Sequence, residues 1–332
     1  MAVKGQKGPG ATMPAQRMLW GLGAANVAAW IWAAEAFGGV PRLLGMAGLA
    51  WLFGLRHAMD ADHIAAIDNA VRRLAEQDRC PAMAGLFFSL GHSTVVVLLA
   101  AAVSLGAGAL RMRLGAMSHY GVWIGTIVSV AFLVLIAGAN LAALRAETRG
   151  GAAPGGVLTW LARPLFRLVR HSRDMYAIGF LFGLGFDTAT EIGLLALSAA
   201  GTTHGIAAWR LMALPALFTA GMSLVDTADS ALMARAYVWA LRNGRARRHY
   251  NVTLTAVSAV IAMVVGGAEL LGLTGHSSGS GLSRVAALLA AHWSALGMAI
   301  ALTLAGLFLA SIRRSRVEAR IAGQTPPSAP PG

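Results

Sequence analysis

Residues 43–67 read LLGMAGLAWLFGLRHAMDADHIAAI, an apolar run that is interrupted by the nine residues RHAMDADHI, 56–64, of which five are ionisable. The run is long enough to cross a bilayer, because a helix needs about 20 apolar residues to span the hydrocarbon core. Ionisable side chains are expensive in that environment, and they mark a functional site by default. This stretch therefore predicts a membrane helix that carries a buried polar site.

The remainder of the chain repeats the apolar pattern. Of its 332 residues, 57% are hydrophobic and 12% are charged, whereas charged residues make up about 25% of an average soluble domain. We predict an all-α polytopic membrane protein of about eight transmembrane helices. One transport domain over 18–312 is expected to lie between cytoplasmic tails at 1–17 and 313–332, the second Pro-rich and disordered. The predicted spans are 18–38, 43–70, 82–108, 121–143, 175–200, 209–234, 251–274 and 286–310.

The basic residues predict the orientation of these spans. The chain has a net charge of +13, and 21 of its 27 Lys and Arg residues lie in the two tails and in alternate connections. Positive loops stay on the cytoplasmic side, so we expect an inner-membrane protein with both termini cytoplasmic. The positive net charge is thus explained by membrane topology and contact with lipid headgroups, and it does not indicate binding to nucleic acid. A single cysteine, Cys80, excludes a disulfide within the chain and a multi-cysteine metal cage.

Histidines and carboxylates gather in four of the predicted spans. At a rise of about 1.5 Å per residue, all four groups come near the middle of the membrane. We therefore predict one shared metal site formed from several spans. Its candidate ligands are His57, Asp60, Asp62 and His63 in the second span, His92 in the third, Asp187 and Glu191 in the fifth, and Asp226 and Asp229 in the sixth.

A regular helix does not bring all the ligands of the second span together. At about 100° per residue, His57, Asp60 and His63 share one face, whereas Asp62 points away from them. We expect either a local distortion of the helix, with Gly54 as a possible hinge, or a role for Asp62 outside the set of direct ligands. The alternative to a metal site is a structural role, in which the two acids only form hydrogen bonds with the two imidazoles.

Two pairs of short motifs suggest an internal repeat. DADHI (60–64) and FSLGHS (88–93) resemble DTATEI (187–192) and FTAGMS (218–223). With the expected orientation, the second and fifth spans would cross the membrane in opposite directions, as in secondary transporters that bind substrate at the midplane. The matches are short, so chance similarity is the alternative.

The donor set narrows the chemistry. Imidazole suits Ni, Zn, Cu and Fe, and the absence of a cysteine ligand disfavours Cu(I). We expect Met59 and Met222 to be packing residues and Asn26 to hydrogen-bond between helices. Asp68 is expected to be solvated at the cytoplasmic end of its span.

At these residues the chain resembles the nickel/cobalt transporter family of secondary permeases, the high-affinity nickel permeases. The family signature R-H-A-[V/F]-D-A-D-H-I is matched by 56–64. Three further motifs follow in order: L-G-H-S/F-T-V-V at 90–96, L-G-F-D-T-A-T-E at 184–191 and G-M-x-L-x-D-T-x-D at 221–229. These four motifs cover most of the membrane region.

The resemblance implies uptake of Ni²⁺, with Co²⁺ as a further substrate, and no enzymatic activity. It implies essential roles for His57, Asp62 and His63, with His92 assisting, and it implies no resident cofactor because the metal is the substrate. Met59 departs from the family signature, which leaves the choice between nickel and cobalt open. A proton-coupled carrier of another small substrate, a metal exporter of the same superfamily and an intramembrane metalloenzyme are the alternatives. The chain has no His-rich loop, which favours import.

Overall fold

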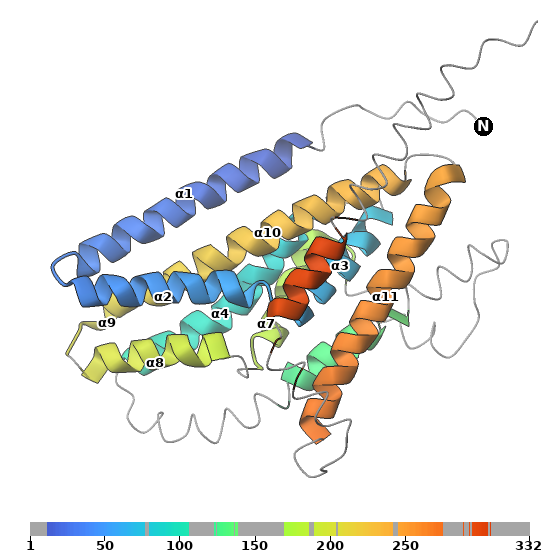
Figure 1. Ribbon diagram of the computed structural model, residues 1–332. Helices are drawn as coiled ribbons and strands as arrows, with labels where there is room; N and C mark the ends of the chain where they lie inside the picture. Colours follow the sequence, from blue (N-terminus) through green and yellow to red (C-terminus); the bar gives the residue numbers. More distant parts are fainter. Residues whose placement is uncertain are drawn as a thin grey trace, which may run out of the picture.

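The computed structural model describes residues 12–76, 80–105, 123, 125–135, 137–138, 169–185, 189–203, 205–241, 245–274, 288, 292, 294–304 and 306. All regular structure in these ranges is helical, which confirms the predicted fold class. Figure 1 shows the long helices lying side by side, with α11 crossing them. The elements are α1 (Thr12–Phe37), α2 (Pro41–His57), α3 (Ala61–Glu76), η1 (Pro81–Met83), α4 (Ala84–Ser104), η2 (Ser172–Asp174), α7 (Met175–Phe182), α8 (Ala189–Thr203), α9 (Ala208–Leu211), α10 (Ala213–Leu241) and α11 (Arg245–Thr274).

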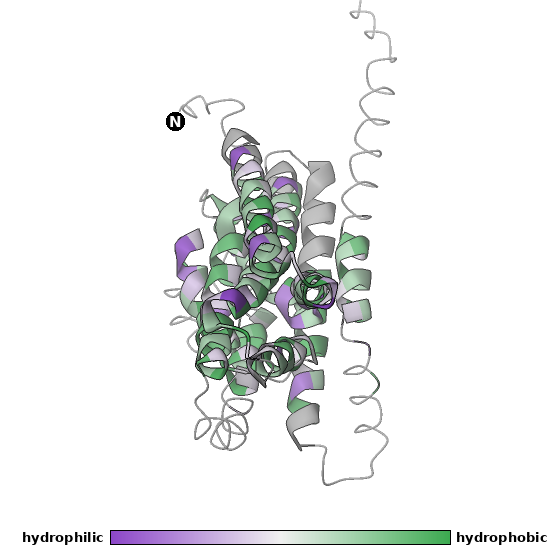
Figure 2. Ribbon diagram, turned by 90° about the vertical axis from the view of Figure 1, so that its left-hand side faces the viewer, coloured by the Kyte–Doolittle hydropathy of each residue, from purple (hydrophilic) through white to green (hydrophobic). Residues whose placement is uncertain are grey.

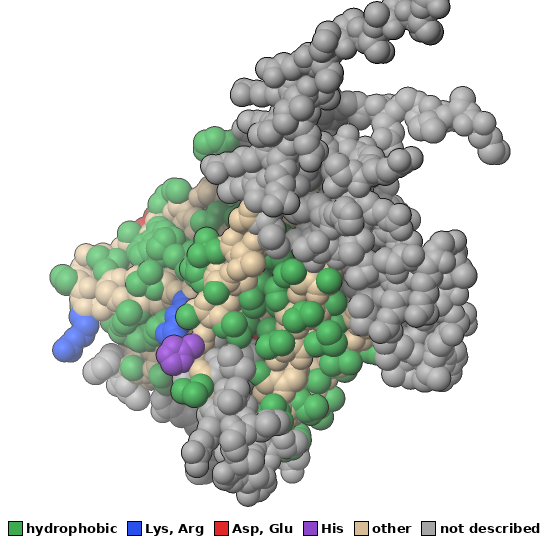
Figure 3. Space-filling model, turned by 45° about the vertical axis from the view of Figure 1, so that its right-hand side comes forward, with side chains coloured by type: hydrophobic (Ala, Val, Ile, Leu, Met, Phe, Trp, Pro, Cys, Tyr) green, Lys and Arg blue, Asp and Glu red, His purple; other side chains and the backbone are tan. Residues whose placement is uncertain are grey.

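The outer surface of this bundle is apolar. Figure 2 shows that hydrophobic residues predominate along the helices, and Figure 3 shows hydrophobic side chains over one face of the described residues, where acidic side chains are scarce. Leu98, Ile127 and Leu302 are 60%, 54% and 66% exposed, as expected for side chains that face lipid. Two helical stretches, Pro81–Ser104 and Ala208–Tyr237, are long and apolar enough to cross a membrane within the described residues. The number of spans and the domain limits stay predictions.

The second span, predicted over 43–70, is interrupted, which confirms the first of the two alternatives, a local distortion. The break lies at 58–60 and not at the expected hinge Gly54, which is helical. The helix α2 ends at His57, residues 58–60 form a turn, and α3 starts again at Ala61. The turn is closed by backbone hydrogen bonds from Met59 N to Arg56 O and from Asp60 N to His57 O. The polar helix α3 is buried along nearly all its described length, so only α2 has the composition of a lipid-facing span.

The predicted continuous helix over 175–200 is also interrupted. The helix α7 ends at Phe182, and α8 starts at Ala189. Residues 186–188, which include the candidate ligand Asp187, lie outside the described residues. Residues 183–185 are not helical, so the fifth span is interrupted directly before DTATEI, whereas the second span is interrupted at 58–60, where DADHI begins. Both interruptions thus lie next to the two related motifs.

The helices of the two halves also pack alike. The helix α2 packs closely on α10, and α7 packs closely on α4. A Cβ atom on Gly54 of α2 would collide with the backbone carbonyl of Phe218 in α10. In the same way, a Cβ atom on Gly179 of α7 would collide with the backbone carbonyl of Phe88 in α4. Phe88 and Phe218 are the first residues of the two related motifs FSLGHS and FTAGMS.

The third residue after each phenylalanine has the reciprocal contact. A Cβ atom on Gly91 of α4 would collide with the carbonyl of Tyr176 in α7, and one on Gly221 of α10 would lie 2.8 Å from the carbonyl of Trp51 in α2. Glycines at helix crossings permit close approach of the two backbones. The equivalence of the two crossings supports a duplicated architecture rather than chance similarity of short motifs.

Two hydrophobic clusters flank the interruption of the second span. One contains Ala58 together with parts of α1, α2 and the first half of α10. The other contains Ala61 together with parts of α3, α4, α7 and α11. The turn 58–60 lies where the two clusters meet, and the candidate ligands project from its two sides.

Candidate metal site

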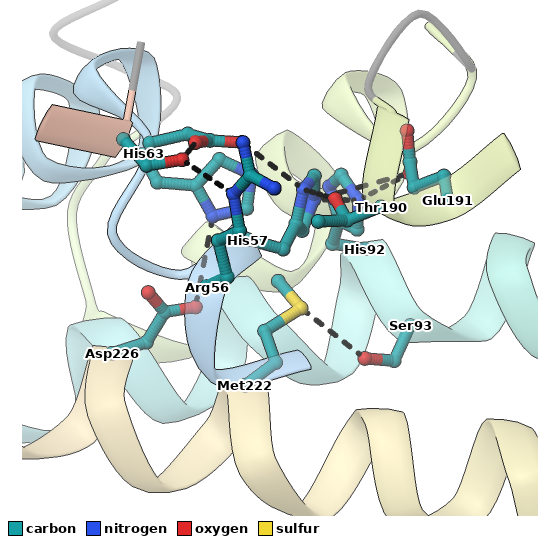
Figure 4. A network of polar contacts seen from close by, with 11 residues as sticks. Arg56, His57, His63, His92, Ser93, Thr190, Glu191, Met222 and Asp226 are labelled. Carbon is teal, nitrogen blue, oxygen red and sulfur yellow. Dashed lines mark hydrogen bonds and ion pairs between the residues drawn. The ribbon is translucent and has the colours of Figure 1, made fainter. Parts of the chain in front are cut away.

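Three histidines from different helices converge at the interruption. His57 ends α2, His63 lies in the first turn of α3, and His92 lies within α4. One nitrogen atom from each ring lies within 4.8 Å of the other two. The three residues are 1%, 1% and 3% exposed. Figure 4 shows the rings facing one another between the helices, so this cluster is a buried site with three imidazole donors.

Glu191 completes one side of the cluster. Its Oε1 atom lies 2.8 Å from His92 Nε2, which in turn lies 2.9 Å from His57 Nε2. The distance from Glu191 Oε1 to His57 Nε2 is 3.9 Å. The neighbouring Thr190 brings its Oγ1 atom to 3.2 Å from the other nitrogen of His57, Nδ1. The interrupted fifth span thus contributes a carboxylate and a hydroxyl to the site, as its motif predicts.

Asp60 contacts His57 from the opposite side. Its Oδ2 atom lies 3.4 Å from His57 Nδ1, and the residue is 4% exposed. Arg56 begins the motif RHAMDADHI. It reaches Asp60 through Ser294, since Arg56 Nε donates to Ser294 Oγ and the serine hydroxyl donates to Asp60 Oδ1. Sequence reasoning missed Ser294, because serine in an apolar span carries no distinctive signal.

The remaining acids lie on the side of His63. Asp226 Oδ2 is 3.8 Å from His63 Nδ1, and Asp226 is 1% exposed. Neither carboxylate oxygen of Asp226 has a hydrogen-bond partner among the described residues, and the same holds for Asp62 Oδ1 and Asp229 Oδ2. Buried polar atoms are normally hydrogen-bonded, and each exception needs an explanation. Oxygen atoms without partners beside a histidine cluster are suited to receive a cation.

The ends of the broken helices add to the electrostatics. Asp62 lies in the first turn of α3, and Glu191 lies in the first turn of α8. Acidic side chains there are stabilised by the positive end of the helix dipole. The negative end of α2, by contrast, terminates at the site and favours a cation. This arrangement gives Asp62 a role even though it does not belong to the three-histidine group.

Asp68 is buried, and the expectation that it is solvated is wrong. It is 2% exposed, and its Oδ1 atom accepts a hydrogen bond of 2.8 Å from Tyr237 Oη. Tyr237 Oη also lies 3.0 Å from Ser258 Oγ in α11. Asp68 was expected to be solvated because an uninterrupted span would leave the membrane near this residue. The helix α3 instead continues inside the protein.

This contact gives a stability prediction. Tyr237→Phe removes the donor to Asp68, and hydrogen bonds to charged groups contribute about 1.5–3 kcal/mol. We expect a lower unfolding midpoint in detergent. Tyr176→Phe is the matched control, because Tyr176 is 40% exposed and its hydroxyl contacts the half-buried side chain of Thr94 rather than a buried carboxylate. Equal midpoints for the two variants would contradict a stabilising role for the Asp68–Tyr237 hydrogen bond.

The prediction that Asn26 connects helices is confirmed. Asn26 Nδ2 donates to Ala220 O, and its Oδ1 atom accepts from Trp51 Nε1. Met222 is fully buried, and its sulfur accepts a hydrogen bond from Ser93 at 3.6 Å. Figure 4 places Met222 beside the histidine cluster, on the side of α10.

Candidate ligands at the interruptions of two helices, within a helical bundle with exposed apolar side chains, are typical of a membrane transporter. Comparison with known proteins is consistent with this class. The model of the high-affinity nickel-transport protein family matches residues 43–314, and the chain belongs to this family. The resemblance seen in the four motifs is thereby confirmed.

Several characterised relatives share most of the chain. A high-affinity nickel transport protein of Cupriavidus necator is 47% identical over 265 residues, which cover 75% of this chain and 76% of the relative. The hydrogenase nickel incorporation protein HupN of Bradyrhizobium diazoefficiens is 47% identical over 77% of this chain and 71% of its own length. The cobalt transport protein NhlF of Rhodococcus rhodochrous is 41% identical over 70% of this chain and 72% of its own length. No solved structure matches the chain.

Proposed function

We propose that this protein imports Ni²⁺, and Co²⁺ as a second substrate, across the cytoplasmic membrane. The ion binds at His57, His63 and His92 together with Glu191. The family supports a divalent metal ion as the substrate, and the related proteins are named for nickel in two cases and for cobalt in one. The metal is a transported substrate, so no resident cofactor is required.

The spacing of the donor atoms is the observation that carries this proposal. Two ligands at about 2.1 Å from an ion lie about 3.0 Å apart at a right angle and about 3.4 Å apart at a tetrahedral angle. His57, His92 and Glu191 place their donor atoms 2.9, 2.8 and 3.9 Å apart, and two ligands of one ion at this bond length lie at most about 4.2 Å apart. One ion can therefore reach all three donor atoms, and a mixed set of imidazole nitrogen and carboxylate oxygen suits Ni²⁺.

The acids beyond His63 supply the second requirement of transport, which is release. A transported ion must be bound firmly enough to enter and weakly enough to leave. Asp62, Asp226 and Asp229 offer buried oxygen atoms without hydrogen-bond partners. We propose that they attract the cation and share it with His63, whose Nδ1 atom lies 3.8 Å from Asp226. We propose that Asp187 is a further ligand, because it begins the motif DTATEI, which is related to DADHI.

Competition for uptake tests the substrate. Cells that express the protein are given radiolabelled Ni²⁺ with an excess of Co²⁺, Zn²⁺ or Mn²⁺. We expect Co²⁺ to reduce nickel accumulation strongly, because it is the proposed second substrate, and Mn²⁺ to reduce it little, because the nitrogen donors disfavour Mn²⁺. Reduction by Zn²⁺ as strong as that by Co²⁺ would contradict a preference for nickel and cobalt. Absence of nickel accumulation would instead favour a carrier of another substrate, and accelerated nickel loss from preloaded cells would indicate an exporter.

The orientation of the chain has its own test. We propose that both termini are cytoplasmic, which places the connection between α3 and α4 inside the cell. Its Cys80 is exposed and is the only cysteine of the chain. A membrane-impermeant maleimide is expected to label Cys80 in permeabilised cells and not in intact cells. Labelling of intact cells at the same rate would invert the proposed topology.

A further inference from the structure

The helical segment Ser294–Leu304 packs against the turn that interrupts the second span. A Cβ atom on Gly297 would collide with the carbonyl oxygen of Met59 and would lie 3.0 Å from the amide nitrogen of Ala61. Gly297 is buried. The two backbones are therefore in direct contact, and a larger residue at 297 would displace the turn. This contact brings the last described helix of the chain to the edge of the metal site.

A chain of polar contacts runs from this helix to His57. Arg56 Nε donates to Ser294 Oγ at 3.3 Å, and Ser294 Oγ donates to Asp60 Oδ1 at 2.5 Å. The second carboxylate oxygen of Asp60 lies 3.4 Å from His57 Nδ1. A hydroxyl has one hydrogen to donate. Because Arg56 donates to the serine oxygen, that hydrogen remains directed at Asp60.

Asp60 is the charged partner of His57 Nδ1, which also lies 3.2 Å from the hydroxyl of Thr190. A carboxylate that accepts the Nδ1–H of an imidazole fixes its tautomer and leaves the lone pair of Nε2 available to a metal. In His57 the Nε2 atom is the one that faces His92, at 2.9 Å. In Figure 4 the side chain of Arg56 lies beside His57, and its Nε atom donates to Ser294. Ser294 thus influences the tautomer of His57, and with it the lone pair of Nε2, through Asp60.

We propose that Ser294 is a positioning residue of the metal site, and that the segment Ser294–Leu304 thereby controls how tightly the site binds divalent metal. Ser294 does not touch the ion. It holds Asp60, and Asp60 holds His57 in the tautomer that binds. The proposal rests on the proposed function, since it requires a metal at the three histidines.

Nickel binding to the purified full-length protein in detergent tests this role without transport. Loss of the partner of a metal-bound histidine, here Asp60, typically weakens binding about 10–100-fold. We expect Ser294→Ala, which acts through Asp60, to weaken binding measured by equilibrium dialysis by about tenfold. Ser294→Thr keeps the hydroxyl and should retain most of the affinity. Thr303→Ala is the matched control, because it removes a hydroxyl from the same helix that bonds only to the carbonyl of Ala299 and is exposed. It should bind as the wild type does.

Two further variants separate a positioning role from a structural one. Asp60→Asn should weaken binding by itself, and adding Ser294→Ala to it should cause little further loss, because both changes break the same chain of contacts. Wild-type affinity in Ser294→Ala, or fully additive losses in the double variant, would overturn the proposal. If Ser294→Ala does not accumulate, Ser294→Cys is measured instead and should also bind weakly, because a thiol is a poor donor.

The same assay distinguishes failure of this role from failure of the site. If His57→Ala binds nickel as the wild type does, the three histidines are not the site, and the proposed function fails with it. If His57→Ala loses binding while Ser294→Ala retains it, the site stands and only the positioning role is wrong.

Discussion

Replacing His92 by alanine is expected to reduce nickel uptake to the level of cells that lack the protein. His92 Nε2 lies within 2.9 Å of both His57 Nε2 and Glu191 Oε1, so its loss removes the donor that joins the two halves of the site. The family resemblance implies that His92 only assists the motif His57–His63. The geometry instead predicts an effect as large as that of His57→Ala, at least about 100-fold and beyond the effect of losing an indirect partner.

The measurement is the initial rate of radiolabelled nickel uptake, normalised to the amount of protein in the membrane. His171→Asn serves as a control for the loss of an imidazole, since the His171 side chain is 42% exposed. Asparagine is also a preferred residue at a helix N-terminus, and His171 precedes η2. A rate for His92→Ala above about one tenth of wild type would show that the site does not depend on this residue.

Replacing Gly54 by alanine is expected to be strongly damaging although it adds only one methyl group. The added methyl group would overlap the carbonyl group of Phe218, which belongs to the backbone of α10 and cannot rotate away. Forced overpacking costs about 1–3 kcal/mol, and here it also shifts α2, whose last residue is His57. We expect a lower unfolding midpoint, less protein in the membrane and slower uptake per molecule.

Gly48→Ala is the matched control for this substitution. Gly48 lies in the same helix, and a Cβ atom at this position meets nothing within 4 Å. Alanine is also the better helix former, so the variant should be as stable as the wild type or slightly more so. Gly179→Ala should resemble Gly54→Ala, because it meets the carbonyl of Phe88 in the equivalent crossing. Equal stability of the Gly54 and Gly48 variants would contradict the close backbone contact.

The sequence specified much of this protein because the membrane imposes simple rules. Backbone polar groups in lipid must be satisfied within a segment, which leaves helices as the solution for long apolar runs. The same environment makes the positions of His57, His63, His92 and Glu191 conspicuous, since few ionisable residues tolerate it. Helical periodicity also suggested the distortion near Asp60 as one of two alternatives, because one regular helix does not direct Asp60, Asp62 and His63 to the same point.

The tertiary structure decided which of these residues meet and what orients them. The sequence offered no means of seeing that α3 turns inward, which buries Asp68 against Tyr237. It also gave no signal for Ser294, which contacts Asp60 across a separation of 234 positions. Periodicity reports only the local path of one helix, whereas these contacts depend on how separate helices cross. The crossings depend on close backbone contacts at Gly54, Gly179 and Gly297, where the absence of a side chain matters only once the neighbouring helix is in place.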